Sequence, residues 1–286
     1  MISALNRLKD NTIELTITIP LKDVEDGIKA TLIKLSKEVT IKGFRKGKAP
    51  IKKVEENIGK GKIIEEATND IIVKAYIKAL EEHNLKPIIS PKVAIISKED
   101  KKDWQIKAIT CEFPKVDVGS YKEDLKKELA KDSIWTPDKK KAGGQAADNR
   151  EEKIDKIFKA LTKTQEITVP KPLIEDEVNR MLSRLIEQTS KLGMTIEQYL
   201  TSIGKNSETL RKEYETQAVE TIKLELILSA IADLEKIEAK EEDVKKMINT
   251  APDEETRKKL ESPQQQIYIK QLLRKRTVID NLSKLI

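Results

Sequence analysis

A strict alternation of apolar and polar residues marks the first clear element of the chain. Between Thr12 and Pro20, isoleucine or leucine takes every second position, and threonine or glutamate takes the positions between them. This period-two pattern predicts a half-buried β-strand that Pro20 ends. We expect two more strands at 88–97 and 104–113, joined by a charged turn.

Between the first strand and the last two, apolar residues recur at three- and four-residue steps, which predicts helices. The expected helices span about 21–38, 50–58 and 60–83, and the last of them ends at Asn84 and Pro87. The order is strand, helix, loop, two helices, strand, strand. The first 118 residues are therefore expected to form an α+β domain in which a sheet packs against helices.

The second half of the chain is helical by the same criterion and is expected to be all-α. The helices are predicted at about 154–161, 172–192, 195–202, 207–234 and 240–249, with a last one from 262 onwards. Ser207 is the expected cap of the longest one. The stretch 119–150 differs, because Pro137, a lysine triplet and two adjacent glycines give it the composition of a linker. The interpretation is a domain over 1–118, a linker over 119–150 and a helical domain over 151–286.

Composition narrows the classes of function. Charged residues make up 36% of the chain and aromatic residues 3%, which favours long solvated helices over an enzyme with a deep core. One cysteine and one histidine leave no intrachain disulfide and effectively exclude a His/Cys metal site. We expect no cofactor, no catalytic constellation, no membrane partner and a cytosolic location, since the chain lacks a long apolar run. His83 is interpreted as a helix-end residue rather than a catalytic one.

The net charge of +6 is mild, so the basic signal matters only where it is local. It is strongest in a loop that follows Lys42 and reads Gly43-Phe44-Arg45-Lys46-Gly47-Lys48-Ala49-Pro50. The two glycines permit positive φ, so the segment can form a compact protruding loop, and Pro50 suits the first turn of the next helix. An aromatic residue among cations indicates an anchor for an acidic partner, and RNA is the first candidate.

The octapeptide closely resembles the ribosome-docking signature of the trigger factor family of bacterial chaperones, and the order of elements over 1–118 resembles that family's ribosome-binding domain. The resemblance implies that Lys42, Gly43, Phe44, Arg45, Lys46, Gly47 and Lys48 contact protein and RNA of the large ribosomal subunit beside the exit tunnel. Residues 151–286 resemble the family's substrate-binding domain, whose helices form two arms. The family's FKBP-type prolyl-isomerase domain would need roughly a hundred residues where 119–150 stands, so the chain looks like a short form without it.

The resemblance implies an ATP-independent chaperone that binds nascent or unfolded polypeptides and assists their folding and export, with a homodimer as an option for the free protein. Flexible methionines and amphipathic tyrosines suit binding without specific readout. The candidates for such contacts are Met181, Met194, Tyr199, Tyr214, Met247 and Tyr268. Two alternatives stay open: a peptidyl-prolyl isomerase, as in full-length members, and a plain RNA-binding helical scaffold.

Overall fold

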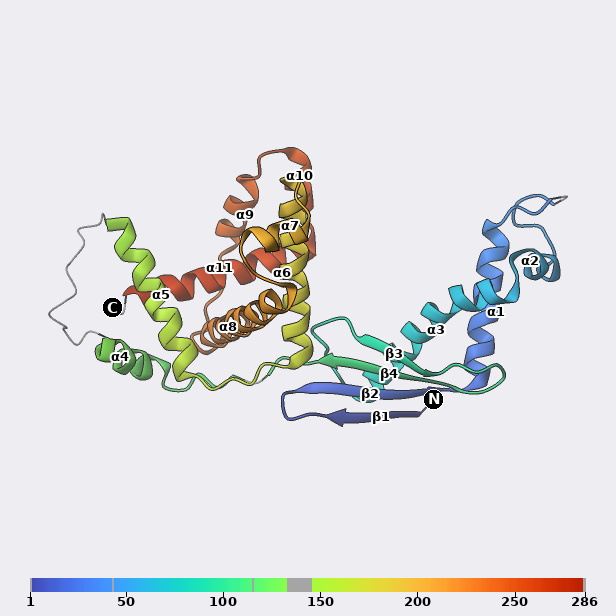
Figure 1. The fold of residues 1–286 in the computed structure, drawn as a ribbon, viewed down its shortest axis with the longest axis horizontal. Helices are drawn as coiled ribbons and strands as arrows, with labels where there is room; N and C mark the ends of the chain where they lie inside the picture. The colour runs from blue at the N-terminus through green and yellow to red at the C-terminus, as the bar shows by residue number, and fades with distance from the viewer. Residues whose placement is uncertain (1, 43, 115, 133–145, 285–286) are drawn as a thin grey trace. The chain divides into compact units, whose positions relative to one another are not determined.

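The structure is a computed structural model that describes residues 2–42, 44–114, 116–132 and 146–284. The chain folds into two compact units (Figure 1). Unit 1 comprises Met1–Phe113 and Pro170–Asp176, and unit 2 comprises Pro114–Val169 and Glu177–Ile286. Within the described residues, no helix combines the length and the apolar character that a bilayer crossing requires.

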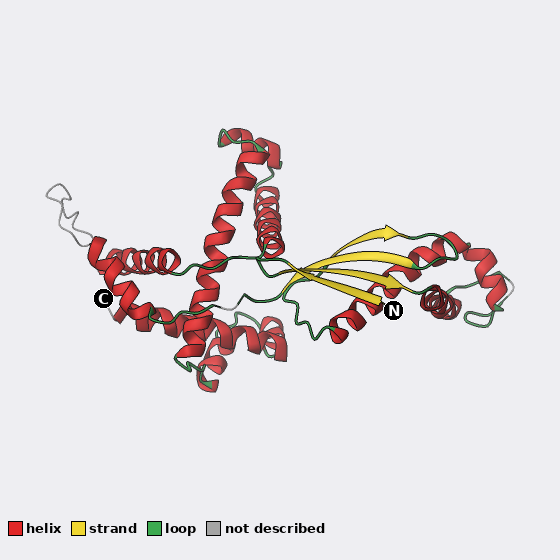
Figure 2. Ribbon diagram, turned by 90° about the horizontal axis from the view of Figure 1, so that it is seen from below, coloured by secondary structure: helices red, strands yellow, loops and turns green. Residues whose placement is uncertain are grey.

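Unit 1 contains a four-stranded antiparallel sheet in the order β1-β2-β4-β3. Its strands are the yellow arrows in Figure 2. The strands are β1 (Ile2–Arg7), β2 (Thr12–Ile19), β3 (Lys92–Ser97) and β4 (Trp104–Cys111). The alternation over 12–20 is confirmed as β2, whereas β1 was not predicted from the sequence. The strand expected from residue 88 begins only at Lys92, because a proline at 91 lacks the N–H that a ladder needs.

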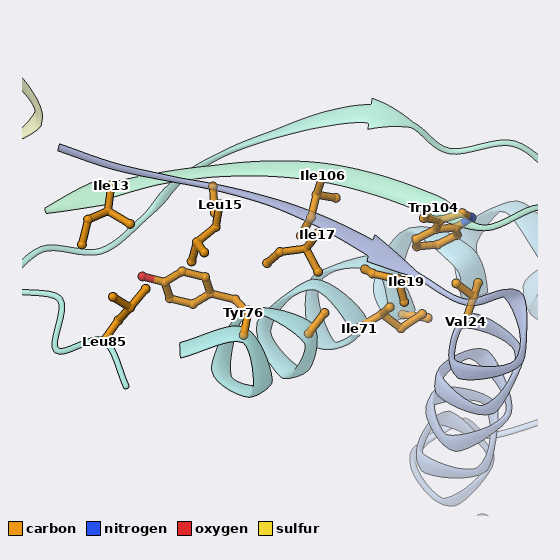
Figure 3. Packing of buried hydrophobic residues seen from close by; sticks show 14 residues of the cluster. Ile13, Leu15, Ile17, Ile19, Val24, Ile71, Tyr76, Leu85, Trp104 and Ile106 are labelled. Carbon is orange, nitrogen blue, oxygen red and sulfur yellow. The ribbon is translucent and has the colours of Figure 1, made fainter. Parts of the chain in front are cut away.

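Three helices complete unit 1 and confirm the predicted order: α1 (Leu21–Glu38), α2 (Ile51–Ile58) and α3 (Lys60–Glu82). The apolar face of β2 packs against α3, so that Ile17 and Ile71 share one core (Figure 3). The first and third helices pack tightly because Gly27 carries no side chain. A Cβ at that position would lie 2.3 Å from Cγ1 of Ile71, too close for any larger residue.

A second, smaller apolar cluster of unit 1 ties together the far end of α1, the loop after it, α2 and the start of α3. Its buried members are Leu32, Ile41, Val54 and Ile63, and Ala49 and Ile58 pack against them among others. Both ends of the loop between α1 and α2 are therefore held by apolar contacts with this cluster, through Ile41 at one end and Ala49 at the other.

Unit 2 is helical, as predicted. Its elements are α4 (Tyr121–Asp132), α5 (Ala146–Thr164), α6 (Lys171–Lys191), α7 (Ile196–Ser202), α8 (Ser207–Leu234), α9 (Glu241–Asn249), α10 (Glu254–Leu260) and α11 (Pro263–Lys284). The first residues of α6 belong to unit 1, where the Lys171 N–H donates to Asp10 Oδ2 at 3.1 Å. The main core of unit 2 joins α4, α5, the second half of α8 and the end of α11 around Leu125, Ile157 and Ile231.

Three details of unit 2 differ from the expectation. α5 begins at Ala146, within the stretch expected to be linker, and α4 places Tyr121 and Leu125 in the main core. α10 was not foreseen. The cap of α8 is Asn206 rather than Ser207: its side chain accepts from the Thr209 N–H, while Ser207 is the first helical residue. α7 begins with a reciprocal capping box formed by Thr195 and Gln198.

Two further apolar clusters of unit 2 stand apart from its main core. One, called the α7 cluster here, packs Leu185 of α6, Leu200 of α7 and Leu210 of α8 together. The other, the α9 cluster, packs Val244 and Ile248 of α9 against Ile269 of α11. Both clusters have few members, so each leaves part of its apolar surface in contact with solvent.

Candidate functional site

The basic loop (residues 42–50) leaves α1 at the end of that helix that points away from the sheet (Figure 1). Ile41 is buried just before it, and its carbonyl accepts from the Phe44 N–H at 3.0 Å. A second turn follows, in which the Lys48 N–H donates to the Arg45 carbonyl at 2.9 Å. Pro50 occupies the N-cap position of α2, one residue before the first turn for which the sequence suggested it. These turns hold the backbone on either side of Arg45 and Lys46 in a defined shape.

Gly47 meets the requirement that the sequence suggested, because its φ is +75°, in the left-handed region that side chains disfavour. It also lies against the last turn of α1. A Cβ built at Gly47 would be 3.4 Å from the carbonyl oxygen of Lys37. Gly43, the other glycine expected to permit such a turn, lies outside the described residues.

The side chains of the loop point outward. Phe44 is 41% exposed. Lys42, Arg45, Lys46 and Lys48 are exposed as well, and no ion pair or side-chain hydrogen bond joins any of them to another described residue. The loop thus offers one aromatic ring and four uncompensated cations to a partner.

Positive charge is concentrated around this loop, and the net charge of the whole chain does not reveal it. Residues 34–62, called the basic tip here, contain ten basic and three acidic residues, a net charge of +7. The whole chain carries +6, so all the other residues together amount to −1. A local excess of this size attracts polyanions over a distance of about 8–10 Å at ordinary ionic strength.

Of the six methionines and tyrosines predicted to bind polypeptide, two pack into the α7 cluster, and the other four lie on or next to helices of unit 2 without packing into either small cluster. Tyr199 and Tyr214 are half-buried and pack into the α7 cluster. Met247 and Tyr268 are exposed, on α9 and α11, the helices of the α9 cluster. Met181 on α6 and Met194, just after that helix, are half-buried. The structure therefore brings the two tyrosines of the first cluster together and leaves Tyr268 as the most exposed of the six, at 61%.

Several exposed aliphatic residues that the sequence analysis missed lie in the same regions. On α6, Ile186 is 51% exposed, and Leu192, just after its end, is 76% exposed. On α11, Ile267 and Leu272 are exposed beside Tyr268. Sequence reasoning chose methionine and tyrosine by residue type. A signal was nonetheless present, because Ile186 directly follows Leu185 and so falls outside the buried stripe of its helix.

The titratable groups of the described residues do not form a catalytic centre. His83 ends α3 as expected, and its Nε2 lies 2.9 Å from Ser3 Oγ. The same serine donates to Glu82 Oε2 at 2.6 Å, so the carboxylate orients the serine and not the imidazole, unlike in a hydrolase triad. Burial raises the pKa of the Cys111 thiol to about 11, which leaves it protonated and unreactive. Among the described residues, no group of three or more His, Cys, Asp or Glu could hold a metal ion.

Comparison with known families matches almost the whole chain. A family model described as bacterial trigger factor protein matches residues 1–140, and one described as the C-terminus of that protein matches residues 139–284. A trigger factor of Clostridium perfringens is 34% identical over 143 residues, and one of Streptomyces avermitilis is 33% identical over 121 residues. These matches cover 46% and 42% of this chain but only 33% and 26% of the relatives, so the chain matches a third or less of their length.

A solved structure from work on promiscuous substrate recognition in the folding and assembly activities of the trigger factor chaperone has the same fold. It aligns with a TM-score of 0.63 over 99% of both chains at 13% identity. The part of the chain that the structure describes contains no FKBP-type domain, and α4 and α5 are separated only by residues 133–145.

Proposed function

The chain belongs to the bacterial trigger factor family, and from this we propose that it is an ATP-independent chaperone that docks on the large ribosomal subunit through residues 42–48 and binds nascent or unfolded polypeptides. The proposed domains are 1–118 for docking, 119–150 as the connection and 151–286 for client binding. The observation that carries the docking role is the exposed Phe44 among four uncompensated cations on an anchored loop.

Three residues of the basic loop contribute to the free energy of docking in different ways. Phe44 still has 41% of its surface to bury, which is worth about 1 kcal/mol on a partner. Arg45 offers a planar fork for a carboxylate or a phosphate, and Lys46 adds a point charge. Because hydrogen bonds fix the backbone on both sides of these residues, little conformational entropy is lost when they bind.

Client binding is proposed for the apolar residues around the α7 and α9 clusters. Side chains such as Leu192 and Ile267 present aliphatic surface without hydrogen-bonding groups that would select a particular sequence. Contacts of this kind are individually weak and reversible, so a client is released without hydrolysis of a nucleotide.

The direct test is co-sedimentation with ribosomes of a variant carrying Phe44→Ala, Arg45→Ala and Lys46→Ala. We expect at least a tenfold loss of affinity, since an apolar anchor and two cations are removed together. A control that also removes one phenylalanine and two positive charges replaces Phe113, Lys74 and Lys78, which are exposed elsewhere on unit 1, with alanine, and it should bind normally. Equal binding by the loop variant and the wild type would remove the loop from the mechanism.

A further inference from the structure

A second group of cations lies close to the basic loop and has no role in the docking described above. Lys60 and Lys62 occupy the first turn of α3, on either side of Gly61 and directly after Gly59. Both lysines are exposed, and no ion pair or side-chain hydrogen bond joins either of them to another residue that the structure describes. The same turn contains no acidic residue.

The stability of the fold does not account for these two lysines. The first turn of a helix carries a partial positive charge, so cations there are unfavourable, whereas Asp or Glu would be stabilising. No side chain caps α3 either, because its N-cap residue is Gly59. Lysine at both positions is therefore unfavourable for the helix of the free protein and indicates a use outside the fold.

The apolar cluster beneath the basic loop joins the two groups of cations into one body. Ile63, which follows Lys62, is buried in the same cluster as Ile41, which precedes Lys42. Ile58 and Ala49 also pack against that cluster. A partner held by the basic loop is therefore presented to Lys60 and Lys62 without any rearrangement of the helices.

The surroundings of the two lysines suit a phosphate backbone rather than a protein surface. Ile63 is buried and Ile58 and Ile64 are half-buried, so no exposed apolar side chain within this turn could serve as a hot-spot anchor for a protein. Apart from the neighbouring backbone, no atom lies within 4 Å of the place where a Cβ of Gly59 or Gly61 would be, so a phosphate strand can approach the backbone here. Two flexible lysine ammonium groups that solvent can reach are suited to contact the phosphate oxygens of a nucleic-acid backbone.

We propose that Lys60 and Lys62 form a second contact of unit 1, to the phosphate backbone of RNA next to the docking position of the basic loop. This inference rests on the proposed docking to the large subunit. It assigns two tasks to the basic tip: Phe44 and Arg45 choose the site, and the turn at residues 59–62 adds affinity that depends on salt but not on base sequence.

The test measures the affinity of a Lys60→Ala/Lys62→Ala variant for purified large subunits at several salt concentrations. Loss of two phosphate contacts should lower the slope of log affinity against log salt by about 1.4 to 1.8. The matched control is Lys74→Ala/Lys78→Ala, which removes the same charge from exposed positions farther along α3 and should keep the wild-type slope. An unchanged slope for the first variant would overturn the second contact.

A cross-linking measurement identifies the partner. A photoreactive amino acid at position 62, in the otherwise unchanged chain, should attach to ribosomal RNA, and cross-links to ribosomal protein alone would overturn the assignment. Failure of this inference is distinguishable from failure of the proposed function. If the wild type does not bind large subunits at any salt concentration, docking itself is wrong. If it binds and only the Lys60/Lys62 result is negative, the second contact alone is wrong.

Discussion

The hydroxyl of Tyr121 donates a hydrogen bond of 2.6 Å to Oε1 of Glu235, and this bond joins the first residue of α4 to the C-cap of α8. Lys122 Nζ lies 2.5 Å from the same carboxylate oxygen. Hydrogen bonds from Lys122 and Tyr121 lower the pKa of Glu235, so the carboxylate remains charged at neutral pH. The contact thus adds a hydrogen bond to the apolar packing by which α4 belongs to the main core of unit 2.

Tyr121→Phe is expected to destabilise unit 2 by about 1–2 kcal/mol, because a hydrogen bond to a charged acceptor is lost while the ring still fills the core. Urea unfolding followed by circular dichroism measures the change. The matched control is Tyr268→Phe on α11, where the ring is 61% exposed, and its midpoint should stay within experimental error of the wild type. Equal stability of both variants would show that the Tyr121–Glu235 bond contributes nothing.

Acid should weaken unit 1 through Glu112. Partial burial raises the pKa of this carboxyl, but hydrogen bonds from the Lys86 N–H at 2.7 Å and from Arg7 at 2.8 Å outweigh that effect, and the pKa is lowered overall. A group with a lowered pKa stabilises the fold fully above its unfolded pKa of about 4.3 and loses that contribution as the pH falls.

Glu112→Gln should therefore cost about 1 kcal/mol at pH 7, and the difference from the wild type should shrink as the pH falls below about 4. Urea titrations at several pH values measure both quantities. Glu66→Gln, on the exposed face of α3, removes the same charge and serves as the control. A difference that stays constant from pH 7 down to pH 3 would contradict the assignment.

Gly47→Ala tests whether the shape of the basic loop matters for docking. A side chain at a φ of +75° costs about 1 kcal/mol, although the new Cβ would be in no more than van der Waals contact with the Lys37 carbonyl oxygen. We expect weaker co-sedimentation with ribosomes and a loss of stability of about 1 kcal/mol at most. Gly204→Ala imposes similar backbone strain at a φ of +65° in unit 2 and should leave ribosome binding intact. Full binding by the Gly47 variant would mean that the charges act without a fixed loop.

Ile186→Ser/Leu192→Ser should lower the ability to suppress aggregation of a denatured client without ATP. Both side chains are largely exposed, so the fold loses little while two apolar contacts to the client disappear. The control is Val73→Ser/Ile77→Ser on α3, which removes two exposed aliphatic residues from unit 1. Equal losses in both variants would show that general surface hydrophobicity, rather than the region around the α7 cluster, holds clients.

Turnover of a short proline peptide should be negligible. Among the described residues, two cavities beside α4, of about 250 and 540 Å³, each have Tyr121 as their single aromatic lining residue, which is unlike an aromatic-lined prolyl site. A protease-coupled assay with an unrelated isomerase as positive control measures the rate. Isomerisation well above the uncatalysed rate would revive the enzymatic alternative.

Most helices and three strands could be predicted because their apolar positions repeat over many residues. β1 escaped because it is an edge strand in which only Leu5 packs on the core. α10 escaped because Leu260 is its only apolar residue. Its ends carry other signals. The Thr256 N–H donates to the side chain of the N-cap residue Asp253, the first turn contains acidic residues, and the last turn contains basic residues. Such local electrostatic cues are weaker than periodicity and are easily overlooked.

The candidate site divides in the same way. The exposure expected for Phe44 and the positive φ expected for Gly47 are present in the structure, because local sequence determines both. The sequence alone did not indicate which aliphatic residues of unit 2 are exposed and available to a client. Whether Leu192 faces water or a neighbouring helix depends on contacts between elements distant in the sequence, and residue type alone does not determine them.

The uneven distribution of charge gives unit 1 an electric dipole whose positive end is the basic tip. In the field of a polyanionic particle this dipole experiences a torque, so the molecule turns its tip toward the particle before any contact forms. Under the proposed function, arrival would be fast at low ionic strength and would slow as salt screens the field, whereas apolar contacts to a client would not weaken with salt. Departure from the particle and release of the client would thus respond to different conditions, and each could occur without the other.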